Sequence, residues 1–142
     1  EANTEGIETW LRLRYGNFSA NMSYTYTNST DEKDRIIAEI SRHTGSAGFT
    51  WHFNEQISIN LSNIYLGKRE NPKVIPTEGV KTLPAYFIWN GTFSVNDFYG
   101  VKFSLSVKNI FDTEYYHTSN RSPERYRQPQ RTILFTAGYS LF

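Results

Sequence analysis

The polar residues between positions 112 and 130 have the clearest binding chemistry in this sequence. Guanidinium groups form charge-assisted hydrogen bonds with anionic oxygens, and aromatic rings stack on cations, so together they suit an anionic, aromatic ligand. The alternative is that they keep an exposed loop polar and pair with phosphates or with loop carboxylates such as Glu124. The candidate ligand-binding residues are Tyr115, Tyr116, Arg121, Arg125, Tyr126 and Arg127.

Patterns for catalysis or metal binding do not occur in the sequence. His43, His52 and His117 lie on different segments without the spacing of metal ligands, so surface or lumen polarity is the favoured role. Cysteine is absent, which excludes thiol catalysis, disulfides and cysteine-based zinc sites. No nucleophile elbow, phosphate loop or paired-acid motif occurs. We therefore expect no enzyme activity, no cofactor and no bound metal.

Composition leaves two classes of β-protein open. The sequence has 142 residues and a net charge of +1, which gives no electrostatic case for nucleic acid. Mean hydropathy is -0.57, and the longest apolar run, residues 85–89, is far shorter than the roughly 18 residues of a membrane-spanning helix. Aromatic residues make up 16% of the chain. These features fit an aromatic-rich soluble β-protein or a membrane β-barrel.

Polar and apolar residues alternate along most of the chain. In residues 18–28 the apolar side chains occupy every second position and serine, asparagine and threonine fill the others. Side chains of a strand alternate between its faces, so this segment has one apolar and one polar face. The pattern recurs in 7–15, 46–53, 57–65, 87–95, 101–108 and 132–141, with Trp10 and Ile88 out of step. About seven strands of roughly ten residues result, a length that crosses a bilayer when tilted.

The connections between these strands favour the membrane class. Short turns at 15–17, 54–56 and 96–100 alternate with long loops at 28–43, 68–83 and 112–130. In an antiparallel meander this places short turns at one rim and long loops at the other, as in outer-membrane barrels. Aromatic residues gather near both strand ends, as the interfacial girdles of such barrels do. They are Tyr15, Phe18, Trp51 and Phe53 at the short turns and Tyr26, Tyr65, Phe87 and Phe111 at the loops.

The pattern also predicts the direction of individual side chains. In a barrel the apolar face contacts lipid and the polar face lines the lumen. We expect Leu11, Met22, Phe49, Leu61, Trp89, Leu105 and Phe135 to face lipid, and Arg12, Asn21, Thr50, Asn60, Asn90 and Ser104 to face the lumen.

Seven strands are too few to close a barrel of this kind. Unpaired backbone groups at the two open edges would cost several kcal/mol each in lipid, and bacterial single-chain barrels have an even number of strands, at least eight. The polar face carries bulky charges such as Arg12, Arg14 and Lys108, which need a wide lumen. The sequence opens within a strand and ends on an aromatic residue. We expect residues 1–142 to be the C-terminal segment of a larger barrel.

Two local patterns carry structural predictions. Ser29, Thr30, Asp31 and Glu32 have the spacing of a capping box, and isoleucines follow at helical intervals at positions 36, 37 and 40. A short helical turn is therefore expected in the first long loop. Asn90-Gly91 resembles a hairpin turn, but alternation continues on both sides, which predicts a position inside a strand.

Three stretches resemble one family of outer-membrane proteins. The motif of Asn109, Ile110, Phe111 and Asp112 ends a predicted strand, Leu83-Pro84-Ala85-Tyr86 precedes another, and Gln128-Pro129-Gln130-Arg131-Thr132 leads into the last. In this order they resemble the last strands of TonB-dependent outer-membrane receptors, with Gln130 in place of the family's usual glycine.

The last residues resemble the assembly signal of such barrels. Tyr139, Leu141 and Phe142 are similar to the aromatic C-terminus that the barrel-assembly machinery reads. The usual signal keeps apolar residues at alternate positions back from the terminal phenylalanine. Here Tyr139 and Leu141 share one face and Phe142 falls on the other, which a bulge or a rim position would reconcile.

The resemblance implies a function for the parent protein. Members of this family import scarce nutrients such as ferric siderophores, haem or cobalamin across the bacterial outer membrane. Their barrels have about 22 strands, and a plug domain and a TonB-contacting segment lie at the N-terminus, neither of them in this chain. The implied partners are the rest of the barrel, the plug, a TonB-type energy-transducing protein, outer-membrane lipid and lipopolysaccharide, the metal chelate and the assembly machinery.

Three alternative functions stay open at this point. A porin-like barrel would let solutes diffuse passively and would lack a plug. An outer-membrane enzyme would need a Ser/His pair near the lipid face. A soluble lipocalin-like binder would need no detergent for purification.

Overall fold

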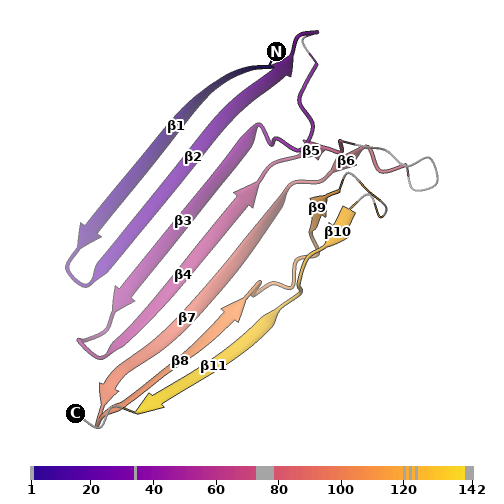
Figure 1. The fold of residues 1–142 in the computed structure, drawn as a ribbon. Coiled ribbons are helices and arrows are strands. Elements are labelled where there is room, and N and C mark those ends of the chain that lie inside the picture. Colours follow the sequence, from indigo (N-terminus) through magenta and orange to yellow (C-terminus); the bar gives the residue numbers. More distant parts are fainter. Residues whose placement is uncertain are drawn as a thin grey trace.

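A single antiparallel sheet of seven strands dominates the computed structural model, which describes residues 2–33, 35–72, 79–119, 121, 123 and 125–139. The strands are hydrogen-bonded in the order β1-β2-β3-β4-β7-β8-β11, so neighbours in the sheet are also neighbours among the long strands of the sequence (Figure 1). This confirms the predicted meander. The seven strands are β1 (Ala2–Tyr15), β2 (Phe18–Asp31), β3 (His43–His52), β4 (Ile57–Leu66), β7 (Tyr86–Phe98), β8 (Val101–Lys108) and β11 (Thr132–Tyr139).

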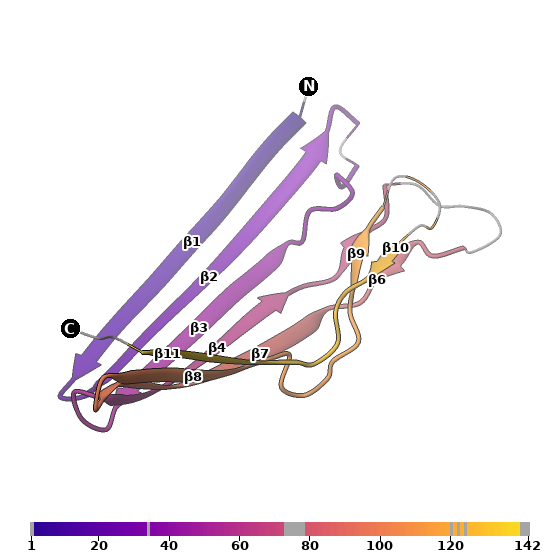
Figure 2. The ribbon, with the colours of Figure 1, turned by 60° about the horizontal axis from the view of Figure 1, so that its bottom comes forward.

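The sheet is curved, and its two ends differ. Figure 2 shows β8 and β11 wrapping round from the plane of β1 and β2. The short turns lie at one end, and the long connections gather at the other. Two of these connections contain small hairpins that periodicity did not reveal, β5 (Arg69–Glu70) with β6 (Thr82–Leu83) and β9 (Tyr116–Thr118) with β10 (Arg125–Arg127). Within the described ranges, no helix is long and apolar enough to cross a membrane.

The strand register sorts the side chains into two faces. Cross-strand partners share a face of the sheet, and the pairs Leu11–Met22, Phe49–Leu61 and Leu105–Phe135 form part of a continuous apolar face. Serine, threonine and asparagine occupy most of the opposite face. Their side chains hydrogen-bond across strands in the pairs Ser23–Ser46 at 2.8 Å, Thr50–Asn60 at 2.9 Å and Thr92–Ser106 at 3.1 Å.

The register agrees with the face expected for every side chain named from the sequence. Leu11, Met22, Phe49, Leu61, Trp89, Leu105 and Phe135 share one face, and Arg12, Asn21, Thr50, Asn60, Asn90 and Ser104 share the other. Asn90 and Gly91 lie within β7, as alternation predicted. Burial is slight because the sheet is one layer thick. Among the described residues, the large side chain that is fully buried is Leu83, in β6 of the β5–β6 hairpin.

The helical turn expected in the first long loop is wrong. Strand β2 runs on to Asp31, and the chain then folds back, so that Thr30 forms an antiparallel bridge with Ile36. The Ile37 N–H donates to the Ser29 carbonyl at 3.0 Å. The backbone at the end of β2 therefore finds its hydrogen-bond partners in a short ladder, and the described residues of this loop form no helix.

The third short turn is tighter than expected. Strand β7 continues through Phe98, and its pairing with β8 shifts between Val95 and Phe98. This irregularity interrupts the alternation, which is why the sequence pattern ended the strand early. The turn itself is Tyr99-Gly100, and both residues have positive φ, 53° and 79°. Such a pair is typical of two-residue hairpin turns.

Candidate functional site

The β9–β10 hairpin of the last long loop presents different side chains on its two faces. Register pairs Arg127 with Tyr116 and Tyr126 with His117. Neighbouring residues of a strand point to opposite faces. Tyr116 and Arg127 therefore share one face, and His117 and Tyr126 share the other.

The arginines of the first face are engaged within the hairpin. The Arg127 guanidinium lies 3.1 Å from a Glu114 carboxylate oxygen, and the Tyr116 hydroxyl donates to the other oxygen. The Arg125 guanidinium carbon lies 4.2 Å from the centre of the Tyr116 ring. The hydrogen bond to Glu114, with desolvation adding to it, raises the pKa of Tyr116. These contacts hold the hairpin together.

Tyr115 and His117 line a hollow of about 400 Å³ on the polar face of the sheet. Ile64 and Ile88 are cross-strand partners on that face, and they give the hollow an apolar patch. The described lining is completed by Tyr86, Asn90, Lys108, Asn109, Pro129, Gln130 and Thr132. The hollow thus combines aliphatic and aromatic surface with amide groups and an ammonium group.

The aromatic side of the hollow is a cluster of three rings, one from β7 and two from the last long loop. The rings of Tyr86 and Tyr115 have centres 4.7 Å apart, and those of Tyr115 and His117 are 6.1 Å apart. Burial, together with the charge of Arg69, lowers the pKa of His117, so its imidazole is neutral at neutral pH. With His117 neutral, the charge among the described lining residues is that of the Lys108 ammonium group. A positive charge in the hollow favours an anionic ligand.

The motif from Asn109 to Asp112 forms a turn that anchors both ends of the last loop. Asn109 is buried with φ of 52°, and its amide both donates to and accepts from the Thr113 backbone at 2.9 Å. Asp112 has φ of 54° and accepts the Arg131 backbone N–H at 2.7 Å. Ile110 donates its backbone N–H to Trp89. The motif therefore has a structural role, and of its four residues Asn109 also lines the hollow.

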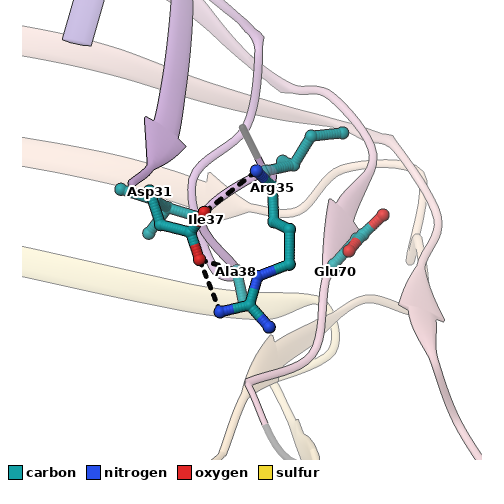
Figure 3. Close-up of a pocket in the computed structure, with 6 residues that line it drawn as sticks. Asp31, Arg35, Ile37, Ala38 and Glu70 are labelled. Atoms are coloured by element: carbon teal, nitrogen blue, oxygen red, sulfur yellow. Dashed lines mark hydrogen bonds and ion pairs between the residues drawn. The ribbon is translucent and has the colours of Figure 1, made fainter. Parts of the chain in front are cut away.

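A second hollow lies at the outer end of β2 and is shown in Figure 3. It measures about 720 Å³ and is lined by Asp31, Arg35, Ile36, Ile37, Ala38 and Glu70. The Asp31 carboxylate accepts hydrogen bonds from the Arg35 side chain at 2.7 Å and from the backbone of Arg35 and Lys33. These bonds lower the pKa of Asp31 from 3.8 to about 2. The charges of Asp31 and Arg35 are thus already paired, and the other charged residue of the lining, Glu70, is an acid that would repel an anionic ligand. The first hollow is therefore the better candidate.

Comparison with known proteins identifies the family. The family model described as TonB dependent receptor-like, beta-barrel, matches residues 1–110. The chain belongs to this family. No curated protein sequence matches it.

Solved receptor structures share the fold of this TonB-dependent receptor barrel. The ferric-catecholate import receptor Fiu of E. coli K12 is 21% identical with a TM-score of 0.80, over 96% of this chain and 20% of that one. The ferripyoverdine receptor of Pseudomonas aeruginosa is 14% identical with a TM-score of 0.83, over 96% and 19%. The copper transporter OprC is 19% identical with a TM-score of 0.75, over 96% and 22%. The chain thus spans about a fifth of the length of these structures.

Family membership assigns the two faces of the sheet. In a transmembrane barrel the apolar face contacts lipid and the polar face lines the lumen. Both the hollow beneath His117 and a further one beside Arg12 and His52 lie on the polar face. The candidate site of this receptor barrel is therefore on the lumen wall, near the rim that carries the long loops.

The structure separates the residues that the sequence grouped as candidate ligand contacts. Of that group, Tyr115 lines the hollow, whereas Tyr116, Arg125 and Arg127 form the network on the far face of the hairpin. Tyr126 is half exposed opposite His117, and Arg121 has an exposed side chain.

Other predictions from the sequence have mixed outcomes. Of the assembly-signal residues, Tyr139 is the exposed last residue of β11, and Leu141 and Phe142 lie outside the described residues. Sequence reasoning missed Arg69, Tyr86, Ile64 and Ile88. The signal that could have found the hollow was Ile88, which breaks the alternation of its strand, as Ile64 does in the strand beside it. Among the described residues, no group of three or more His, Asp or Glu side chains could hold a metal ion.

Proposed function

We propose that residues 1–142 are the C-terminal barrel wall of an outer-membrane transporter that imports a metal chelate such as a ferric siderophore. The remaining strands, to about 22, and a plug domain complete the receptor. A TonB-type protein that contacts its N-terminal part supplies the energy. The observation that carries this proposal is the match of residues 1–110 to the receptor barrel family. The neighbours described as a ferric-catecholate import receptor and a ferripyoverdine receptor support the choice of a ferric chelate.

The hollow supplies the ligand contacts in this proposal. The aromatic rings of a catecholate chelate are flat and carry anionic oxygens, and Tyr115, Tyr86 and His117 offer aromatic surface for such a ring. Lys108 offers a charge-assisted hydrogen bond. Arg121 and Tyr126 lie on the same loop with exposed side chains and are proposed as first contacts from outside. Lipopolysaccharide is the proposed neighbour of the outer rim, and the barrel-assembly machinery inserts the protein.

The test is uptake by cells that make the complete receptor. We expect cells given the iron(III) complex of 2,3-dihydroxybenzoate, labelled with radioactive iron, to accumulate it. Accumulation should stop in a strain without TonB-type protein and when the proton gradient is dissipated. The double variant Tyr115→Ala with His117→Ala should reduce uptake. Tyr99→Ala, an exposed tyrosine at the short-turn end, is the matched control.

The same experiment separates active import from passive diffusion. A porin-like channel would transport the complex without TonB-type protein and without saturation. Such a result would refute the proposal. If cells do not take up this chelate, ferric citrate and copper complexes are the next probes. Structurally similar proteins include a ferric citrate transporter and a copper transporter.

A further inference from the structure

Arg69 is a buried cation at the base of the outer hairpins. It is the first residue of β5 and is 7% exposed. Its Nη2 donates to the backbone carbonyl of Tyr116 at 2.9 Å, and its guanidinium carbon lies 5.6 Å from the centre of the Tyr86 ring. One side chain thus joins three segments: the β5–β6 hairpin, the first residue of β7, and the β9–β10 hairpin.

These contacts lead directly to the hollow. The Tyr86 ring contacts the Tyr115 ring in a tilted arrangement, and Tyr115 lies beside His117. All three line the hollow. Arg69 does not line it, so Arg69 acts on the hollow through the two residues that it contacts. A backbone hydrogen bond links the first long loop to the same region, because the Glu39 N–H donates to the Glu70 carbonyl at 2.9 Å.

The burial of Arg69 is costly. A guanidinium taken out of water needs hydrogen bonds or a counter-charge. The Nε of Arg69 has no hydrogen-bond partner, and no carboxylate of the described residues forms an ion pair with it. An apolar side chain of similar length would fill the same volume without this cost. The stability of the fold therefore does not explain why a cation lies at this position.

We propose that Arg69 is the positioning residue of the hollow, which holds Tyr115 and His117 against Tyr86 and so sets the hollow's preference for an anionic ligand that carries aromatic rings. This inference rests on the proposed function. The hydrogen bond to the Tyr116 carbonyl fixes the backbone between Tyr115 and His117. The positive charge disfavours a second positive charge on His117, so the hollow keeps a neutral imidazole beside the Lys108 ammonium.

The test uses the complete receptor in lipid nanodiscs, with Arg69→Met and Arg69→Lys as variants. Methionine keeps most of the length and removes the charge, and lysine keeps the charge and loses the planar guanidinium that lies over the Tyr86 ring. Arg42→Gln is the matched control, because Arg42 is exposed and is not among the described residues that line the hollow. The probe is the iron(III) complex of 2,3-dihydroxybenzoate, and its Kd is measured by quenching of tryptophan fluorescence. The pKa of His117 is measured by NMR, with its resonance assigned by its loss in His117→Gln.

We expect Arg69→Met to raise Kd about tenfold, and Arg42→Gln to leave it within about twofold. In a receptor that already carries Tyr115→Ala and His117→Ala, Arg69→Met should add less than about twofold, because its effect passes through those residues. The pKa of His117 should rise in Arg69→Met and stay low in Arg69→Lys. Arg69→Lys should still raise Kd, and it serves as the test if Arg69→Met does not fold.

Two results would overturn the inference. One is an unchanged Kd in the folded Arg69 variants, and the other is an equal loss of affinity with and without Tyr115 and His117. If the wild-type receptor binds neither the iron(III) complex of 2,3-dihydroxybenzoate nor ferric citrate nor copper complexes, the proposed function fails. The NMR titration of His117 then tests the role of Arg69 by itself. A raised pKa of His117 in Arg69→Met then supports the positioning role, and an unchanged pKa refutes it.

Discussion

Arginine at position 105 and arginine at position 104 should have very different effects on the stability of the barrel. Leu105 lies on the apolar face between Phe93 and Phe135, and Ser104 lies on the polar face between Ser94 and Thr136. The two positions are neighbours in β8, so the two side chains start at nearly the same depth in the membrane. The contrast therefore isolates the direction of the side chain.

The expected cost follows from the depth of Leu105. It lies four positions after Val101, the first residue of β8 after the short turn. At about 3.4 Å per residue and a tilt of about 45°, Leu105 stands roughly 10 Å above that rim, near the middle of an apolar band about 25 Å tall. Arginine there should cost about 2–4 kcal/mol. This corresponds to a fall of roughly 30- to 1,000-fold in the folding equilibrium constant.

Ser104→Arg should cost far less, because the new side chain extends into the wet lumen. Lys102 lies on the same face two residues away, and repulsion between the two cations adds a cost below about 1 kcal/mol. The assay is reversible folding of the complete receptor into lipid vesicles, followed by denaturant titration. Equal losses of stability at the two positions would show that lipid does not contact the apolar face, and the assignment of the two faces would fall.

Three further predictions concern turns, close approaches and pH. Asn109→Ala should lower the free energy of unfolding by about 2–4 kcal/mol, because alanine disfavours positive φ and leaves buried backbone groups unpaired; denaturant titration measures it. Gly67→Ala should lower it by about 1–3 kcal/mol, since the new Cβ would lie 2.9 Å from a backbone oxygen, whereas Gly138→Ala meets open space and is the control. The Asp31–Arg35 interaction should be fully present above pH 3.8 and should weaken as pH falls toward 2, because the folded-state pKa of Asp31 is lowered. Amide exchange of this loop, measured relative to the intrinsic exchange rate at each pH, should rise over that range in wild type and not in Asp31→Asn.

The sheet could be predicted from the sequence because each strand contacts two different media. Lipid selects apolar side chains at positions such as Leu105, and water permits polar ones at Ser104, so a period of two residues persists through the strand. A shift of one residue in register would exchange the two faces, which fixes the pairing as well. Strand order followed from the alternation of short turns and long loops.

Features that depend on contacts between segments could not be predicted in this way. Ile64 and Ile88 each look like an isolated exception in their own strand, and only the register makes them a pair. The capping-box spacing did mark a real polar cap, but the Asp31 carboxylate caps a turn at the end of a strand. Strands β5 and β6 have two residues each, too few for any periodicity.

The candidate site was predicted in its residue types and only partly in its geometry. The arginines and tyrosines of the last loop were recognised from their chemistry. Which of them are free to meet a ligand depends on Glu114, because that carboxylate holds Arg127 and Tyr116. This choice is made by the register of the β9–β10 hairpin, which the sequence pattern does not reveal.

The turn at Asn109 and Asp112 makes the last loop exchangeable. Asn109 closes the backbone at the start of the loop, and Asp112 holds the Arg131 N–H where the final strand begins. These hydrogen bonds set the distance between the two ends of the loop, whatever residues lie between them. Insertions, deletions and wholesale replacement of residues 114–128 should leave the register of β11 unchanged. Mutation can therefore remodel this loop freely while the barrel still folds, and grafting loops between receptors at these two points offers a route to new ligand specificity.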